Sequence, residues 1–199
     1  AARYTEAASS SNIISFDMGG TTAKICIIED GKPSLTGQFE VHTVNLKRNS
    51  GLPIDIPAID LVEIGSGGGS IARVELGSIK VGPESASSLP GPICYGRGGT
   101  KPTVTDADLV LGYLSADGFL GGEMKLDRAG AVKQLTTLAD QLGTSVGDVA
   151  AGIYRVVGES MTAAARAHAA DRGIDYRGLP LFAFGGAGPV HACYVADLL

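Results

Sequence analysis

Residues 16–24 read FDMGGTTAK, at the point where one apolar, β-branched stretch (12–17) gives way to the next (23–29). Both stretches predict strands, and a tight hairpin between them needs only one or two residues with positive φ. The two glycines could bring backbone N–H groups close to an anion. Thr21 and Thr22 could donate hydrogen bonds, Asp17 could hold Mg²⁺ directly or through water, and Lys24 could add a compensating charge. By spacing alone, a plain hairpin turn remains an equal alternative.

A second glycine-rich segment stands near the end of the chain, where residues 182–192 read FAFGGAGPVHA. The pattern predicts a buried strand at 180–184, a loop at 185–188 and a helix with Pro189 at its first position. A helix N-terminus behind such a loop attracts phosphate, or lets a flat base pack against bare backbone. Two such loops favour a nucleotide held between two sides of a cleft. Neither loop is a Walker A sequence or a dinucleotide fingerprint.

Strand patterns dominate the first part of the chain. Residues 12–17, 23–29 and 35–46 predict a three-stranded antiparallel meander. A short strand is expected at 60–64, and a hairpin around Gly77 is expected from 71–76 and 78–81. The glycine-, proline- and serine-rich loop region at 82–103 carries too many breakers for regular structure.

Helical patterns follow, over residues 106–173. They predict a short helix at 106–114, a helix between Asp127 and Gly143, and a long helix ending near Gly173. The long helix opens with Ser145 and Asp148 at capping-box spacing. Because a last strand and helix follow these helices, the predicted class is α/β with a mixed sheet.

Composition narrows the classes of partner. The chain has 199 residues and a formal net charge of −5, which disfavours nucleic acid and anionic membranes as main partners. No apolar run approaches the ~20 residues of a membrane span. The opening residues 1–11 lack a signal-peptide core and predict a flexible lead-in and a cytoplasmic location. The cysteines are odd in number and widely spaced, which predicts buried free thiols in a reducing compartment; they are Cys26, Cys94 and Cys193.

Four other titratable residues invite a functional interpretation. Asp106 and Asp108 suit a metal or proton-transfer role, but an acid in the first turn of a helix is more often a cap. His168 and His191 lie on predicted helices at a spacing that forms no metal cluster. His191 could approach a ligand at the second glycine loop, yet we expect it to be a satisfied, partly buried histidine.

The segment DMGGTTAK resembles the phosphate loops of the actin-like ATPase superfamily, which includes sugar kinases and the Hsp70 chaperones. Three further segments make the resemblance narrower: IDLVEIGSGGGSIA (59–72), VGPESASSLPGPICYGRGGTKPTVTDADLVLGYL (81–114) and FAFGGAGPVHA (182–192). Together they resemble the hydantoinase A/oxoprolinase family, the ATP-using subunits of N-methylhydantoinase, oxoprolinase and acetone-type carboxylases. The resemblance runs from about residue 12 to the end.

The resemblance implies an actin-like (ribonuclease H-like) ATPase domain over residues 12–199, with a mixed sheet and packed helices. Members of the family carry an earlier amino-terminal domain with its own Asp-Gly-Gly-Thr loop, and nothing before residue 12 supplies that loop. We therefore expect a fragment that contains the second phosphate loop and the adenosine-side loop only. Such a fragment is expected to be inactive by itself.

The resemblance also assigns site residues. Asp17, Gly19, Gly20, Thr21 and Thr22 would face the β- and γ-phosphates of ATP and their Mg²⁺, with Lys24 beside them. Of these, Asp17, Thr21 and Thr22 would be catalytic, and Asp17 the metal ligand. The residues near the adenosine would be Gly185, Gly186, Ala187 and Gly188. The glycine loops at 65–70 and 94–99 receive no role, and either lines the substrate side of the cleft or simply turns tightly.

The function implied is ATP-dependent hydrolytic opening of a cyclic amide, a ring of the hydantoin or 5-oxoproline type. A hydantoinase B-type partner subunit or domain would complete hydrolysis, and a homo-oligomer is left open. One alternative is a ketone carboxylase subunit, in which ATP activates bicarbonate or an enolate. Another is a non-catalytic, nucleotide-switched module of the actin or Hsp70 kind, against which the long 81–114 segment argues.

Overall fold

The structure, a computed structural model, describes residues 10–199 except 38 and 42–50. Most of the expected lead-in at 1–11 and residues 42–46 of the expected third strand lie outside the described residues. The strands are β1 (Ile13–Met18), β2 (Ala23–Glu29), β3 (Lys32–Pro33), β4 (Leu35–Thr36), β5 (Phe39–Val41), β6 (Leu52–Ile54), β7 (Ala58–Ile59), β8 (Val62–Ile64), β9 (Ser70–Glu75), β10 (Ser78–Ser85) and β11 (Leu181–Phe184). The α-helices are α1 (Val104–Leu111), α2 (Arg128–Leu142), α3 (Val146–Ala170) and α4 (Gly188–Leu198). Short 3₁₀ turns lie at Ile93–Tyr95 and Phe119–Gly122.

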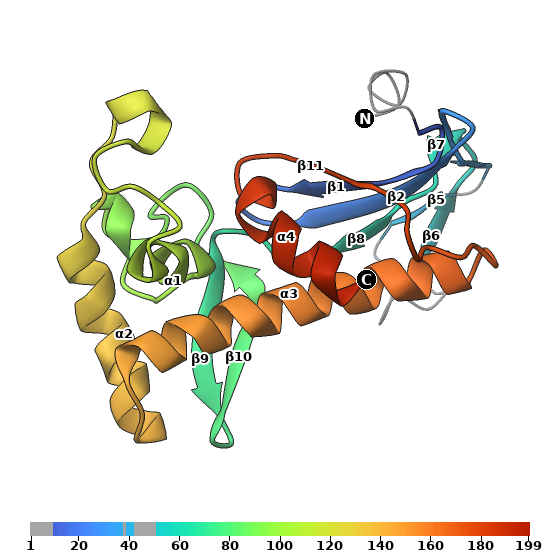
Figure 1. The fold of residues 1–199 in the computed structure, drawn as a ribbon. Coiled ribbons are helices and arrows are strands. Elements are labelled where there is room, and N and C mark those ends of the chain that lie inside the picture. The colour runs from blue at the N-terminus through green and yellow to red at the C-terminus, as the bar shows by residue number, and fades with distance from the viewer. Residues whose placement is uncertain (1–9, 38, 42–50) are drawn as a thin grey trace.

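The central sheet is mixed, as the sequence predicts. Its strand order is β11-β1-β2-β3, and β8 also pairs with β2. β11 runs parallel to β1, whereas β1 and β2 are antiparallel (Figure 1). Asp17 is in register with Phe184 on one side and with Lys24 on the other. Because β1 and β11 are parallel, the loops that follow them leave the sheet at the same edge.

One face of the sheet carries the main core. Alternation along β1 places Ile14, Phe16 and Met18 on that face, where they are almost fully buried. The same cluster takes Ile153 and Val157 of α3 and Val195 of α4, so both helices pack on this face. The side chain of Asp17 alternates to the opposite face, away from the core.

A smaller lobe surrounds the first half of α3. The β9–β10 hairpin, α1 and α2 all pack there, and α3 continues beneath the sheet (Figure 1). The caps follow local sequence signals: Asp127 and Ser145 accept from the first turns of α2 and α3, and Gly143 ends α2 at φ +64°. These predictions are confirmed.

Several predictions about the loops and thiols are wrong. The expected strand 35–46 is broken within its described part: β4 pairs with β7 and β5 with β6, with Gly37 between them. β10 runs into the breaker-rich region as far as Ser85, because β9 offers it a partner and an irregularity after Val81 absorbs the Gly82–Pro83 step. Cys193 is exposed, while Cys26 and Cys94 are buried. Within the described residues, no helix is both long enough and apolar enough to cross a membrane.

Candidate functional site

The β1–β2 hairpin loop contains glycines that its own structure does not require. The Gly19 N–H donates to Thr22 O at 3.0 Å, and neither Gly19 nor Gly20 has a positive φ. A Cβ on Gly19 would meet only Thr22 O, at 3.9 Å, and a Cβ on Gly20 would meet nothing within 4 Å. Among the described residues, the N–H groups of Gly20 and Thr21 donate no hydrogen bond. Open space beside free donors favours an anion site over a plain turn.

The second glycine loop lies directly against the first. Gly185 has φ +86°, and a Cβ there would overlap Asp17 Oδ1 and lie 2.5 Å from Met18 O. The Ala187 N–H donates to Met18 O at 2.9 Å, which pins the loop to the end of β1. Gly186, in contrast, faces open space. Thus Asp17 and residues 185–188 come together, as expected of two loops at one sheet edge.

The N-terminus of α4 adds to this electrostatic environment. Its N-cap, Ala187, makes no side-chain cap hydrogen bond, and Pro189 stands in the first turn. Uncapped N–H groups at a helix N-terminus carry partial positive charge and favour an anion.

A third loop, residues 65–70, supports the hairpin loop from the other side. Gly68 N–H donates to Gly19 O at 3.0 Å, and Gly69 N–H donates to Gly20 O at 2.7 Å. A Cβ on Gly67 would lie 2.5 Å from Thr21 N, so glycine is needed for this close approach. Sequence reasoning left the loop without a role, although its three consecutive glycines are a signal for close backbone packing.

α1 holds this supporting loop in place. Thr105 donates its hydroxyl to Gly68 O at 2.8 Å, and the Thr105 N–H donates to the same carbonyl at 2.8 Å. A Cβ on Gly68 would lie 2.8 Å from Thr105 Oγ1 and 3.5 Å from the Ala187 side chain. The loop is therefore bonded to α1, the helix that follows the breaker-rich region, and lies beside the second glycine loop.

Lys24 points along the sheet rather than out into solvent. Its Nζ donates to Thr22 Oγ1 at 2.5 Å and forms an ion pair with Glu63 of β8 at 3.2 Å. Both charged side chains are about half exposed, so this pair adds little to stability. Its geometric effect is to fix the position of the Thr22 hydroxyl.

Asp106 is a cap, as favoured from the sequence, and it also anchors a loop. It is fully buried and accepts from the Thr103 N–H at 2.9 Å and the Thr103 hydroxyl at 2.8 Å. It also accepts from the N–H groups of Cys94, at 2.8 Å, and Ile93, at 3.3 Å. Burial, with the Asp106 carboxylate beside it, raises the pKa of the Cys94 thiol and keeps that thiol protonated.

Asp108 and His191 form a buried contact that sequence reasoning missed. Asp108 Oδ2 and His191 Nε2 lie 3.3 Å apart, but they are not aligned for a hydrogen bond. Burial raises the pKa of Asp108, and His191 opposes that rise. Asp108 Oδ1 and His191 Nδ1 have no hydrogen-bond partner within the described residues. The expectation of a partly buried, satisfied His191 is wrong, because the ring faces Asp108 of α1, stacks on Tyr154 of α3 and is completely enclosed.

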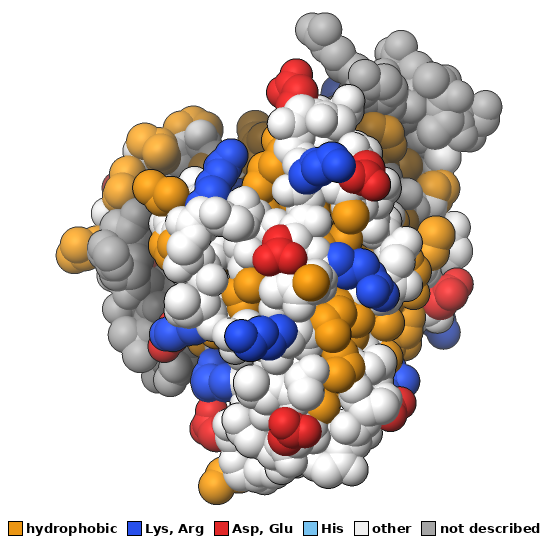
Figure 2. All heavy atoms as spheres, turned by 90° about the vertical axis from the view of Figure 1, so that its left-hand side faces the viewer, with side chains coloured by type: hydrophobic (Ala, Val, Ile, Leu, Met, Phe, Trp, Pro, Cys, Tyr) orange, Lys and Arg blue, Asp and Glu red, His pale blue; other side chains and the backbone are white. Residues whose placement is uncertain are grey.

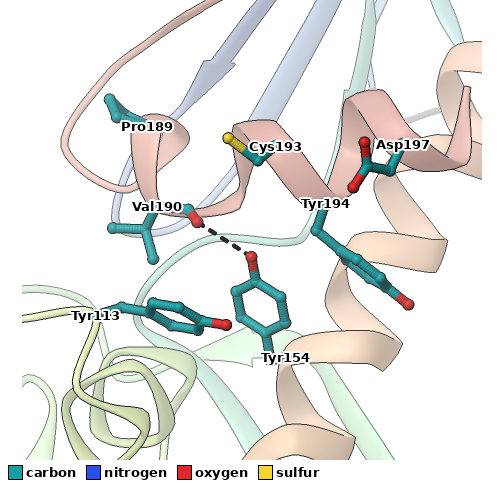
Figure 3. Close-up of a pocket in the computed structure, with 7 residues that line it drawn as sticks. All are labelled: Tyr113, Tyr154, Pro189, Val190, Cys193, Tyr194 and Asp197. Carbon is teal, nitrogen blue, oxygen red and sulfur yellow. Dashed lines mark hydrogen bonds between the residues drawn. The ribbon is translucent and has the colours of Figure 1, made fainter.

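An aromatic pocket lies beside the first turn of α4 (Figure 3). Its volume is about 600 Å³, and its lining residues are Tyr113, Tyr154, Pro189, Val190, Cys193, Tyr194 and Asp197. The Tyr154 hydroxyl donates to Val190 O at 3.1 Å, and burial raises the pKa of Tyr154 to about 12. The three tyrosines come from distant parts of the sequence, so no local pattern could have grouped them.

The metal prediction rests on Asp17. Among the described residues, no group of three or more His, Cys, Asp or Glu side chains could hold a metal ion. Mg²⁺ does not need such a cage, because it commonly takes one or two carboxylates together with phosphate and water oxygens. The Asp17 carboxylate, where the two glycine loops meet, can supply the one carboxylate of such a set.

On the face shown in Figure 2, the surface of the smaller lobe has no patch of charged side chains of a single sign. Lys and Arg side chains are interspersed there with Asp and Glu, around a stripe of hydrophobic side chains.

Comparisons with known proteins find similar sequences and similar folds. The family model described as Hydantoinase/oxoprolinase matches residues 1–199. The chain is 38% identical to the caprolactamase subunit alpha of Pseudomonas jessenii, over 94% of this chain and 26% of that subunit. It is 33% identical to 5-oxoprolinase 1 of Arabidopsis thaliana, over 94% of this chain and 15% of that protein.

Solved structures share the fold. The nucleotide-free structure of acetone carboxylase superposes with a TM-score of 0.85 at 31% identity, covering 98% of this chain and 27% of that chain. The ATP-dependent caprolactamase of Pseudomonas jessenii superposes with a TM-score of 0.82 at 37% identity, covering 98% and 28%. The chain thus spans between about one seventh and three tenths of the length of these relatives.

Proposed function

We propose, from the premise that this chain belongs to the hydantoinase/oxoprolinase family, that it carries part of the ATP site of an enzyme that opens a cyclic amide. The single observation that carries the proposal is the meeting of two glycine loops at Asp17. The N–H groups of Gly20 and Thr21 have no acceptor among the described residues, and open space lies beside Gly20 and Gly186. The names of its relatives, an ATP-dependent caprolactamase and a 5-oxoprolinase, support cyclic amides as the substrate class.

The phosphate end of ATP would lie at the hairpin loop. Gly20 and Thr21 would donate backbone N–H groups to phosphate oxygens, and the hydroxyls of Thr21 and Thr22 would add to them. Asp17 would hold Mg²⁺ directly or through water. Lys24 would act through the Thr22 hydroxyl that it already contacts.

The adenosine end would lie at residues 185–188 and the first turn of α4. Gly186 leaves bare backbone against which a flat base can pack. The neighbouring pocket is lined by Tyr113, Tyr154 and Tyr194, and an aromatic-lined pocket of this size suits a heteroaromatic ring.

When bound, MgATP would supply the phosphoryl group that is transferred to the amide oxygen, and ADP would leave. Water would then add to the amide carbon, and the C–N bond of the ring would break. A second water would hydrolyse the resulting acyl phosphate and release phosphate. This chain's residues would orient the donor and stabilise the charge that develops on the transferred group. Ring opening would be completed by another part of the full-length protein or by a hydantoinase B-type partner. The relatives named as subunits, such as caprolactamase subunit alpha, support such a partner.

A second candidate function is a subunit of an ATP-dependent ketone carboxylase. The observation that favours it is the TM-score of 0.85 with acetone carboxylase. The two functions share the nucleotide site and differ in the acceptor of the phosphoryl group.

One experiment separates the candidates. ADP release by the full-length protein that contains this chain is measured with Mg²⁺, in the presence of ε-caprolactam, 5-oxoproline or hydantoin, and separately of acetone with bicarbonate. We expect stimulation by at least one cyclic amide. Stimulation only by acetone with bicarbonate would select the carboxylase, and no nucleotide binding at all would refute both.

A further inference from the structure

We propose that a small pocket beside the hairpin loop is the subsite for the cyclic amide, a proposal that rests on the proposed function. The pocket has a volume of about 280 Å³ and lies between residues 85–91 and residues 99–101, within the breaker-rich region. Its lining combines apolar and polar side chains: Ile71, Ala86, Leu89 and Pro90, and Ser85, Ser87, Thr100 and Lys101.

The pocket shares a wall with the hairpin loop. Ser85 lines the pocket, and its Oγ lies 3.3 Å from Thr21 Oγ1 and 3.5 Å from Gly20 O. The backbone continues the connection, since Ala86 N–H donates to Gly69 O at 2.8 Å and Gly69 N–H donates to Gly20 O at 2.7 Å. A phosphoryl acceptor has to lie about 3–3.5 Å from the transferred group. A ligand in this pocket would therefore be adjacent to phosphates at Thr21.

The walls of the pocket are preformed. Ser87 has φ +56°, a strained conformation for a residue with a side chain, and its N–H donates to Ser85 Oγ at 3.0 Å. Gly91 N–H donates to Ala86 O at 3.1 Å and closes the 86–91 segment. Gly99 packs so closely on Gly91 that a Cβ would overlap the Gly91 carbonyl oxygen. Strain that is held in this way by neighbouring contacts is characteristic of ligand sites.

The chemistry of the lining suits a neutral ring with one polar edge. Methylene groups would pack against Ile71 and Leu89, while the hydroxyl of Thr100 and the ammonium of Lys101 can donate to a carbonyl oxygen. Lys101 is the only charged lining residue, and it is already paired with Glu84 at 3.8 Å. Bicarbonate, a small anion, would gain nothing from the apolar half. The lining therefore favours a cyclic amide over bicarbonate as the occupant.

The test uses the full-length protein and a variant that fills the pocket, Ala86→Leu. The matched control is Ser88→Leu, two residues away, exposed and outside the lining. Binding of ε-caprolactam, 5-oxoproline and hydantoin is followed by saturation-transfer NMR, and ATP affinity by calorimetry without a cyclic amide. Lactam-stimulated ADP release then gives KM for the lactam that stimulates most.

We expect Ala86→Leu to raise KM for the lactam by at least about tenfold, with the Kd for ATP within about twofold of wild type. Ser88→Leu should change neither. Lys101→Met, on the opposite wall, should also raise KM for the lactam. This second variant keeps the proposal testable if Ala86→Leu fails to fold. The proposal is overturned if both pocket variants keep the wild-type KM, or if none of the three lactams binds. Loss of ATP binding in the wild type would instead refute the proposed function.

Discussion

The carboxylate of Asp17 lies against the backbone of Gly185, so closely that a side chain at residue 185 would overlap its Oδ1. This relationship links the two glycine loops through one point of contact, at the ends of two parallel strands. It also distinguishes the two glycines of the second loop, because Gly186 has open space where Gly185 has Asp17.

We therefore expect Gly185→Ala and Gly186→Val to fail in different ways. Gly185→Ala forces an alanine to φ +86° and displaces Asp17, so the melting temperature and turnover should both fall, the strain costing of order 1–3 kcal/mol. Gly186→Val should keep the fold and weaken nucleotide binding measured by calorimetry. Equal nucleotide affinity in a folded Gly186→Val protein would show that this loop does not touch the ligand.

Asp17→Asn tests the acid itself. The change keeps the shape of the side chain and removes its charge, so the melting temperature should stay within a few degrees. Mg²⁺-dependent turnover of the full-length protein should fall by at least ~100-fold, the scale of losing a positioned electrostatic group. Normal turnover in this variant would show that the hairpin loop is only a structural turn.

The hydroxyls of the same loop give a separate prediction. Thr21→Val and Thr22→Val keep the β-branched shape, and at least one should weaken binding of ATP more than binding of ADP. The reason is that this loop is expected to meet the terminal phosphates. Parallel calorimetric titrations with the two nucleotides measure the ratio, which a purely structural role would leave at the wild-type value.

Gly67→Ala tests the supporting loop. The new Cβ would lie 2.5 Å from Thr21 N and 2.6 Å from Gly20 C, and backbone cannot move away as a flexible side chain can. Overpacking of this kind costs about 1–3 kcal/mol, and we expect both nucleotide affinity and turnover to fall. The control is Gly147→Ala in the first turn of α3, where the nearest atom is Ser145 Oγ at 3.7 Å. A functional Gly67→Ala enzyme would contradict the role given to residues 65–70.

His168 provides a pH prediction. Burial lowers its pKa, with Arg172 adding to the effect, so the folded chain binds a proton less readily than the unfolded chain. Stability should accordingly fall as the pH drops below about 6.5, the pKa of an unperturbed histidine. Urea unfolding at pH 5.5, 6.5 and 7.5 should show a smaller loss for His168→Gln than for the wild type. If the free energy of unfolding falls equally as the pH drops in the two proteins, protonation of His168 does not contribute to the loss of stability.

Local signals in the sequence predicted the local structure well. The caps at Asp127, Gly143 and Ser145 were predictable because a cap involves residues within one turn of each other. The mixed sheet followed from the same logic, since a glycine loop between a strand and a helix implies a parallel partner. The expected strand at 35–46 failed because very short strands depend on partners elsewhere, here β6 and β7.

Contacts between distant residues were beyond reach of the sequence. Asp108 and His191 meet only because α1 packs near α4, and residues 65–70 find the hairpin loop only once the sheet is assembled. Within the candidate site, the sequence predicted roles for the two loops that meet but gave none to the glycine loop at 65–70 that supports them. The aromatic pocket and the pocket beside Ser85 are likewise products of tertiary packing.

The length of α3 has a mechanical consequence. Its 25 residues span roughly 37 Å. Two of its glycines allow close packing on the helix: Ile79 of β10 packs at Gly152, and Tyr194 of α4 packs at Gly158. A tilt of about 5° at one end would carry the other end by about 3 Å over such a length. The sheet and the smaller lobe thus both pack against this one helix. Because α3 is one continuous helix, a rotation of the sheet relative to the smaller lobe requires the whole helix to tilt.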